Sequence, residues 1–189
     1  MTLDEVCPRR MRQFQRSIAA LTHAFDRPIL FKNLYASLRV QAIAHYLPES
    51  LFIVMHRNEI DNGHSLLEAR FERFHDYDPW LSVEPPEIER LRGLPAHEQV
   101  IEQIRHTHLT INRDFELAGI GDNRRFDLVY EDFCENPCKT VEQIQSFLSR
   151  SGCEVAQRAA PPTCFKPRRE VRIDCDLYKR MVSYSKRTA

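Results

Sequence analysis

Hydrophobic positions recur at two different spacings along the chain, and the change of spacing separates expected helices from expected strands. Between residues 9 and 25 the apolar side chains recur every three or four residues, which is typical of one face of a helix. The positions on that face are Met11, Phe14, Ile18, Leu21 and Phe25. An Asp-Arg-Pro segment at residues 26–28 then stops the pattern. Residues 1–27 are therefore predicted to form an amphipathic helix.

Three short apolar runs have the composition of strands instead. They occupy residues 29–32, 51–55 and 126–130. The middle run, Leu-Phe-Ile-Val-Met, shows no alternation with polar residues, as expected for a strand buried on both faces of a parallel sheet. We therefore expect three parallel strands that alternate with helices.

Helical spacing returns between and after these runs. The expected helices are residues 35–47, ended by Pro48, residues 60–74, interrupted by Gly63, and residues 100–118, stopped by Gly119 and Gly121. A last helix opens with Asn136 as N-cap and Pro137 in its first turn, and Gly152 closes it. Residues 78–86 contain three prolines and are expected to form a loop. Alternating strands and helices predict an α/β fold in which ligands bind at the carboxyl ends of parallel strands.

Composition supports a single domain spanning residues 1–189. With 42% hydrophobic and 29% charged residues, the chain can build a core, which excludes disordered and fibrous classes. Lys plus Arg and Asp plus Glu both total 27, so no global excess of charge attracts nucleic acid. Charge is uneven, however, because residues 166–189 contain eight Lys or Arg and three Asp or Glu. We divide the domain into the amino-terminal helix, an α/β core at residues 28–152 and a basic tail at residues 153–189.

Several classes of site and location are disfavoured by what the sequence contains. The longest apolar run has five residues, so we expect no transmembrane segment and a soluble, cytoplasmic protein. Most of the six cysteines are expected to be free thiols, since a chain of this length can fold without disulfides. Cys134 and Cys138 lack the spacing of a zinc site, and no metal is expected. His106 and His108 lie two residues apart on an expected helix, where they should face different directions at its surface.

Arg57 and Ser65 are the first candidates for binding chemistry. Arg57 follows the strand at 51–55, at the ligand-bearing edge of a parallel sheet, and Ser65 lies eight residues later in a helix. A guanidinium group, a hydroxyl and helix-end amides together suit a phosphate, because the guanidinium is always charged and donates in pairs. The structural alternative is a surface arginine at the end of a strand and a serine that caps a helix.

Further residues extend this pattern into a family resemblance. Lys32 ends the first expected strand, Pro48 precedes the strand that leads to Arg57, and residues 130–137 read Tyr-Glu-Asp-Phe-x-x-Asn-Pro. Over residues 28–148 the chain resembles the sulfotransferases that use 3′-phosphoadenosine 5′-phosphosulfate (PAPS). The resemblance implies a three-layer sandwich with a parallel sheet, similar to the P-loop NTPase fold and incomplete at its amino-terminal end.

The resemblance also implies roles for individual residues. Arg57 and Ser65 match the pair that holds the 3′-phosphate of the cofactor, and Tyr130 matches a position that contacts the adenine. Thr163 and Phe165 are similar to a Thr-x-Phe stretch that packs on the adenine, although Phe165 could equally be a core aromatic. In the basic tail, Arg168 and Arg169 are candidate substitutes for a family loop that also binds the cofactor.

The catalytic end of the family's site has no counterpart in the sequence. Sulfotransferases carry a Gly-, Ser- and Thr-containing phosphosulfate loop, whereas this chain has five glycines and none in such a run. Leu34 stands where some relatives have a catalytic histidine, so no base is assigned. Lys32 is a weak candidate for a catalytic charge; its alternative role is to cap backbone carbonyls. Together these features predict the carboxyl-terminal part of a sulfotransferase, with the 3′-phosphate and adenine half of the site and little activity alone.

These sequence features support two hypotheses about the function. In the first, the chain contributes to sulfuryl transfer from PAPS to an acceptor hydroxyl, including one on a carbohydrate. In the second, it is a non-catalytic nucleotide-binding or protein-interaction module that keeps the fold, and the amino-terminal helix recruits a second copy. Light scattering after size-exclusion chromatography would separate a monomer from such a homo-oligomer.

Overall fold

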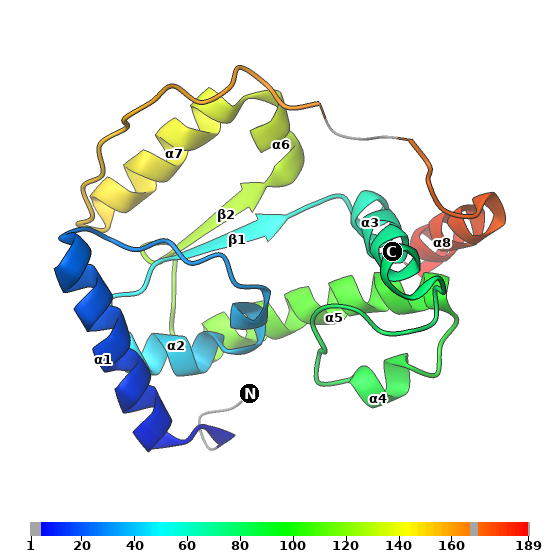
Figure 1. Ribbon diagram of the computed structural model, residues 1–189, viewed down its shortest axis with the longest axis horizontal. Coiled ribbons are helices and arrows are strands. Elements are labelled where there is room, and N and C mark those ends of the chain that lie inside the picture. Colours follow the sequence, from blue (N-terminus) through cyan, green and yellow to red (C-terminus); the bar gives the residue numbers. More distant parts are fainter. Residues whose placement is uncertain (1–4, 167–169, 189) are drawn as a thin grey trace.

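A two-stranded parallel sheet lies near the middle of the molecule (Figure 1). The computed structural model describes residues 5–166 and 170–188. Strand β1 (Phe52–His56) pairs with β2 (Arg125–Val129), and Ile53 lies opposite Phe126. Parallel strands need a long crossover. It consists of helices α3 (Glu59–Phe74), α4 (Ile88–Leu91) and α5 (Ala96–Leu117).

Helices pack on both faces of this sheet. On one face, Phe126 of β2 packs against Phe147 of α7 (Pro137–Arg150), with ring centroids 5.6 Å apart. On the other, Val54 of β1 is buried in a cluster with Ile111 and Phe115 of α5. The predicted α/β class is confirmed in this coarse form. The described residues form two strands where three were expected, so the predicted three-layer sandwich is not established.

The expected first strand is not a strand. Residues 29–32 run as an irregular segment, in which Leu30 is 85% and Phe31 is 56% exposed. An apolar run becomes a strand only where a neighbour accepts its backbone hydrogen bonds, and within the described residues no strand pairs with this one. Lys32, at the end of the run, is exposed. The helix expected at residues 35–47 forms as the 3₁₀ helix η2 (Leu34–Leu38) followed by α2 (Val40–Tyr46).

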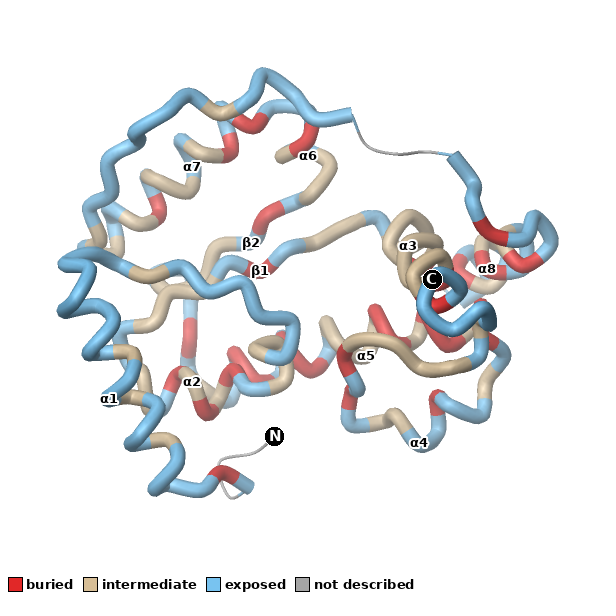
Figure 2. Tube along the Cα trace, viewed as in Figure 1, coloured by how far each residue is buried: buried red, intermediate tan, exposed pale blue. Residues whose placement is uncertain are grey.

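Helix α5 connects two hydrophobic clusters. Its amino-terminal half, with Val100 and Ile101, packs against α3 and against α8 (Cys175–Thr188). Its carboxyl-terminal half, with Ile111 and Phe115, packs against α2 and β1. In Figure 2, red segments along α5 and neighbouring helices mark buried residues. Helix α8 was not expected from the basic composition of the tail, yet it completes the first cluster.

Gly63 does not interrupt its helix, contrary to the prediction. It is buried within α3, and a Cβ atom there would lie 2.9 Å from the Sδ atom of Met181 in α8. The glycine therefore allows α3 and α8 to approach closely. By contrast, Gly152 has the predicted role after α7, with a left-handed φ of +77° just beyond the helix end.

The proline-containing loop is held by a buried polar network. Arg70 of α3 is fully buried and donates to the carbonyl of Tyr77 at 3.1 Å and to Gln99 Oε1 at 2.8 Å. Gln103 Nε2 donates to the carbonyls of Leu81 and Val83. Burial lowers the pKa of Arg70 to about 10, so its guanidinium stays charged at neutral pH. These contacts fix the irregular segment against α5.

Helix α1 (Pro8–Phe25) lies at the margin of the molecule. It has no buried residue, and three apolar side chains of the predicted face, Phe14, Leu21 and Phe25, are exposed. Gln15 contacts the carbonyl of Tyr46 in α2. Recruitment of a second copy through this face stays a prediction.

The predicted free thiols are confirmed for all six cysteines, and no described helix is long and apolar enough to cross a membrane.

Candidate functional site

An open cavity of about 430 Å³ lies at the carboxyl ends of the two strands. Arg57 directly follows β1, and Tyr130 directly follows β2 as the first residue of α6 (Tyr130–Glu135), as the arrows in Figure 1 show. The lining combines residues of α3, residues of α6 and a segment of the carboxyl-terminal tail. It consists of Arg57, His64, Ser65, Glu68, Tyr130, Phe133, Cys134, Phe165, Lys166, Glu170 and Arg172.

Arg57 has hydrogen-bonding capacity that the described protein does not use. Its guanidinium lies over the ring of Tyr130, with the central carbon 4.9 Å from the ring centroid. The Nε atom is buried and has no hydrogen-bond partner among the described residues. A buried unsatisfied donor is unfavourable, which makes Arg57 a candidate to bind an anion in the cavity that it lines.

The helix-end amides near Arg57 are already occupied. Asn58 caps α3, and its side-chain oxygen accepts from the backbone N–H groups of Ile60 at 3.0 Å and Asp61 at 3.2 Å. The hydroxyl of Ser65 donates to the carbonyl of Asp61 at 3.0 Å, so it must rotate to donate to a ligand. An anion here would therefore depend on side chains more than on the amides of the first turn of α3.

Charge in the cavity is partly compensated within the protein. Arg172 lies 3.4 Å from a carboxylate oxygen of Glu68 and 3.6 Å from one of Glu170. Its backbone N–H donates to His64 Nε2 at 3.0 Å, which attaches the tail to α3. Over residues 5–166 and 170–188, neither Arg57 nor Lys166 forms an ion pair. These two cations remain available to an anionic ligand.

Aromatic side chains border the same cavity. Phe165 is 41% exposed, and its ring centroid lies 5.3 Å from that of Phe133 in α6. The backbone N–H of Phe165 donates to the carbonyl of Cys134 at 2.7 Å, which anchors the tail on α6. A hydrogen bond with the Cys134 thiol, assisted by burial, raises the pKa of Tyr130 and keeps its phenol neutral. Phe165 is therefore not a core aromatic, and the cavity combines aromatic surface with two cations that form no ion pair with a described residue.

A comparison with family models identifies the group to which the chain belongs. The model of the sulfotransferase family matches residues 4–152. The chain belongs to the sulfotransferase family. No curated protein and no solved structure matches it. The family resemblance inferred from residues 28–148 is thereby confirmed.

Some of the site residues expected for this sulfotransferase-family chain line the cavity, and others do not. Arg57, Ser65, Tyr130 and Phe165 line one cavity although they are far apart in sequence. Exposed Thr163 and Lys32 do not belong to the lining. The expected Arg168 and Arg169 lie outside the residues that the structure describes.

Further lining residues were not proposed from the sequence, although signals for them existed. Glu68 lies three residues after Ser65, and Phe133 and Cys134 lie three and four residues after Tyr130, so each shares a helix face with an expected residue. Lys166 and Arg172 belong to the basic tail that was recognised only by its charge. Residues three or four positions after an expected residue share its helix face, and this rule would have identified Glu68, Phe133 and Cys134.

Two histidines expected at the surface are partly enclosed in the sulfotransferase-family fold. The side chain of His106 lies within reach of Glu102 and Glu87, and the Nδ1 atom of His108 is buried without a described partner. The reason is that α5 is covered on several sides, which a spacing of two residues does not reveal. Among the described residues, no group of three His, Cys, Asp or Glu side chains could hold a metal ion.

Proposed function

We propose that this sulfotransferase-family chain binds PAPS and takes part in sulfuryl transfer to an acceptor hydroxyl, including one on a carbohydrate. The observation that carries the proposal is the buried, unpartnered Nε atom of Arg57 at a cavity that also contains Ser65. In this proposal Arg57 and Ser65 hold the 3′-phosphate. Lys166 supplies a second positive charge to the same anion.

The aromatic residues fit the other part of the nucleotide. Tyr130 and Phe165 offer ring surfaces to an adenine, and a planar base stacks well on such rings. We assign Thr163 a supporting position beside Phe165, and we retain Arg168 and Arg169 as further cationic partners. No metal ion is needed, because guanidinium and ammonium groups supply the positive charge.

PAPS, when bound, supplies the activated sulfuryl group. The contribution of the chain is to orient the nucleotide through its phosphate and adenine ends, since sulfuryl transfer, like phosphoryl transfer, depends mainly on positioning and charge stabilisation. Lys32 stays the weak candidate for a charge at the reacting end. The proposal assigns no residue as the base that accepts the proton of the acceptor hydroxyl.

Titration calorimetry with adenosine 3′,5′-bisphosphate tests the proposal on the full chain. Arg57→Ala should weaken binding by about 10-fold to 100-fold, because it removes charge-assisted hydrogen bonds to the phosphate. Arg39→Ala is the matched control, since Arg39 also lies over a tyrosine ring, that of Tyr35, but outside the cavity. Equal affinities of the wild type and Arg57→Ala would show that the phosphate assignment is wrong.

A further inference from the structure

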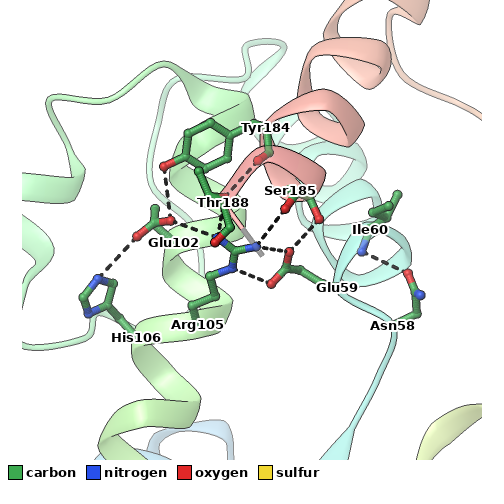
Figure 3. A network of polar contacts seen from close by, with 9 residues as sticks. All are labelled: Asn58, Glu59, Ile60, Glu102, Arg105, His106, Tyr184, Ser185 and Thr188. Atoms are coloured by element: carbon green, nitrogen blue, oxygen red, sulfur yellow. Dashed lines mark hydrogen bonds and ion pairs between the residues drawn. The ribbon is translucent and has the colours of Figure 1, made fainter.

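Arg105 of α5 is the centre of a polar network that joins three helices (Figure 3). A guanidinium group has five N–H donors, and all five of Arg105 find acceptors. Nε and Nη2 each donate to a different carboxylate oxygen of Glu59 in α3, both at 2.7 Å. The remaining donors reach the carbonyl of Ser185 and both the carbonyl and the hydroxyl of Thr188, all in α8.

Glu59 is the point at which this network meets the segment that follows Arg57. It is the first residue of α3 and lies two residues after Arg57. Its Oε1 atom also accepts from the hydroxyl of Ser185 at 2.7 Å. Between them, the backbone N–H of Asn58 donates to Glu131 of α6 at 2.9 Å. Two residues thus fix the backbone that follows Arg57. Asn58 attaches it to α6, and Glu59 attaches it to α5 and α8.

The Arg105–Glu59 pair is suited to hold geometry. Paired parallel hydrogen bonds fix both distance and direction, unlike a single contact from a flexible ammonium group. The two side chains are only 21% and 27% exposed, so water competes weakly for them. The hydrogen bond with Glu59 raises the pKa of Arg105, and Glu102 places a second carboxylate 3.6 Å away.

We propose that Arg105 is a positioning residue for the nucleotide site, which with Ser185 of α8 fixes Glu59 and thereby the orientation of Arg57. This inference rests on the proposed function, because it concerns the contact of Arg57 with the 3′-phosphate. It also makes α8 part of the nucleotide site. The family match ends at residue 152, before α8, so the match itself carries no information about this role.

The test compares two nucleotides that differ only in the 3′-phosphate. Calorimetry on the full chain gives the dissociation constants of adenosine 5′-monophosphate and adenosine 3′,5′-bisphosphate, and their ratio measures the gain from the 3′-phosphate. Arg105→Lys keeps the charge and removes the paired geometry. We expect this variant to reduce the ratio by about fivefold or more while the affinity for adenosine 5′-monophosphate stays within about twofold.

A second variant and a control make the test independent of overall stability. Ser185→Ala removes one hydrogen bond to Glu59 without changing any charge, and it should reduce the ratio in the same direction. Arg113→Lys is the control, because Arg113 lies on the same helix and contacts the adjacent Asp114 instead of Glu59. Its ratio should equal that of the wild type. In an Arg57→Ala background, Arg105→Lys should have no further effect on the ratio.

The outcomes separate this inference from the proposed function. If the wild type binds both nucleotides equally, the proposed phosphate site is wrong. If the wild type prefers the bisphosphate and both Arg105→Lys and Ser185→Ala keep that preference, the positioning role is wrong. Equal weakening of both nucleotides together with a lower melting temperature would show that Arg105 has a structural role only, which also overturns the inference.

Discussion

His56, Asp127 and His108 form a compact polar cluster on the α5 side of the sheet. His56 Nε2 lies 2.5 Å from Asp127 Oδ1, and Arg125 donates twice to the same carboxylate at 2.7 Å. The ring of His108 stacks on that of His56, with centroids 5.0 Å apart. Burial lowers the pKa of His108, and the neighbouring His56 and Arg125 lower it further against a weaker opposing effect of Asp127. The fold therefore favours neutral His108.

We predict that acid weakens the fold through His108. Its pKa in the folded chain lies below the ordinary value of 6.5, so the unfolded chain binds the proton more readily. The stabilising contribution is complete above pH 6.5 and declines as the pH falls through that value toward the lower folded pKa. The free energy of unfolding, measured in urea, should decline between pH 8 and pH 5. The decline should be shallower in His108→Phe than in the wild type.

His23→Gln provides the control for this measurement, because His23 is an exposed residue of α1. The control should show the same pH dependence as the wild type. Some dependence should persist in His108→Phe, since burial also lowers the pKa of His97. An unchanged slope in His108→Phe would contradict the predicted role of His108.

At the scale of single residues, local sequence was sufficient for part of the site. Arg57 was placed correctly because an arginine directly after a strand must lie at the carboxyl end of that strand. The expected burial of this strand on both faces was wrong, since Ile53 and Met55 are exposed. Ser65 followed from helical geometry in the same segment. Lys32 was expected at the end of a further strand, whereas it is exposed in an irregular segment, because no described strand pairs with residues 29–32.

At the scale of elements, the close packing of α3 against α8 depends on Gly63. A Cβ atom at this position would lie 2.9 Å from Met181 Sδ, 3.3 Å from Ile101 Cδ1 and 3.4 Å from Val100 Cγ2. Met181 is fully buried, so its side chain has little room to move. Overpacking of a core costs about 1–3 kcal/mol, whereas alanine gains about 1 kcal/mol over glycine inside a helix.

Gly63→Ala should therefore destabilise the chain by about 1 kcal/mol, measured as the free energy of unfolding in urea. The physical cause is the contact with Met181, which provides a direct control. In a Met181→Ala background the same substitution should become neutral or stabilising, because the cavity accommodates the new methyl group. A stabilising effect of Gly63→Ala in the wild-type background would show that α3 and α8 are not in close contact.

The elements that periodicity predicted well are those with one clear apolar face and clear end signals. Helices α3, α5 and α7 agree with the expected helices in position, and Asn136 caps α7 as expected, accepting from the N–H of Lys139. Helix α8 was missed, although its buried Leu177 and Met181 lie four residues apart. The basic residues within α8 are compatible with a helix, because all four of them, Lys179, Arg180, Lys186 and Arg187, are exposed.

At the scale of the whole molecule, the proposed nucleotide site includes only one end of PAPS. The residues proposed for the 3′-phosphate and the adenine meet there, whereas the sequence contains no Gly-, Ser- and Thr-rich loop for the sulfate end. We therefore expect the 189-residue chain to bind adenosine 3′,5′-bisphosphate but to transfer little or no labelled sulfate from PAPS to sugar alcohols. Robust transfer by this chain alone would contradict that expectation.

The sequence by itself determined the α/β class, the main helices and the family, because these depend on local spacing and on motifs within continuous segments. It also determined that Arg57 lies at the carboxyl end of a strand. The family resemblance implied that the tail reaches the site through Phe165. Only the tertiary structure decided that Phe165 contacts α6 and that α8 packs on α3. Contacts between Glu59, Arg105 and Ser185 span 126 residues of sequence, and no local pattern encodes such a distance. They arise because α5 crosses both clusters and presents its polar side chains where α3 begins and α8 ends.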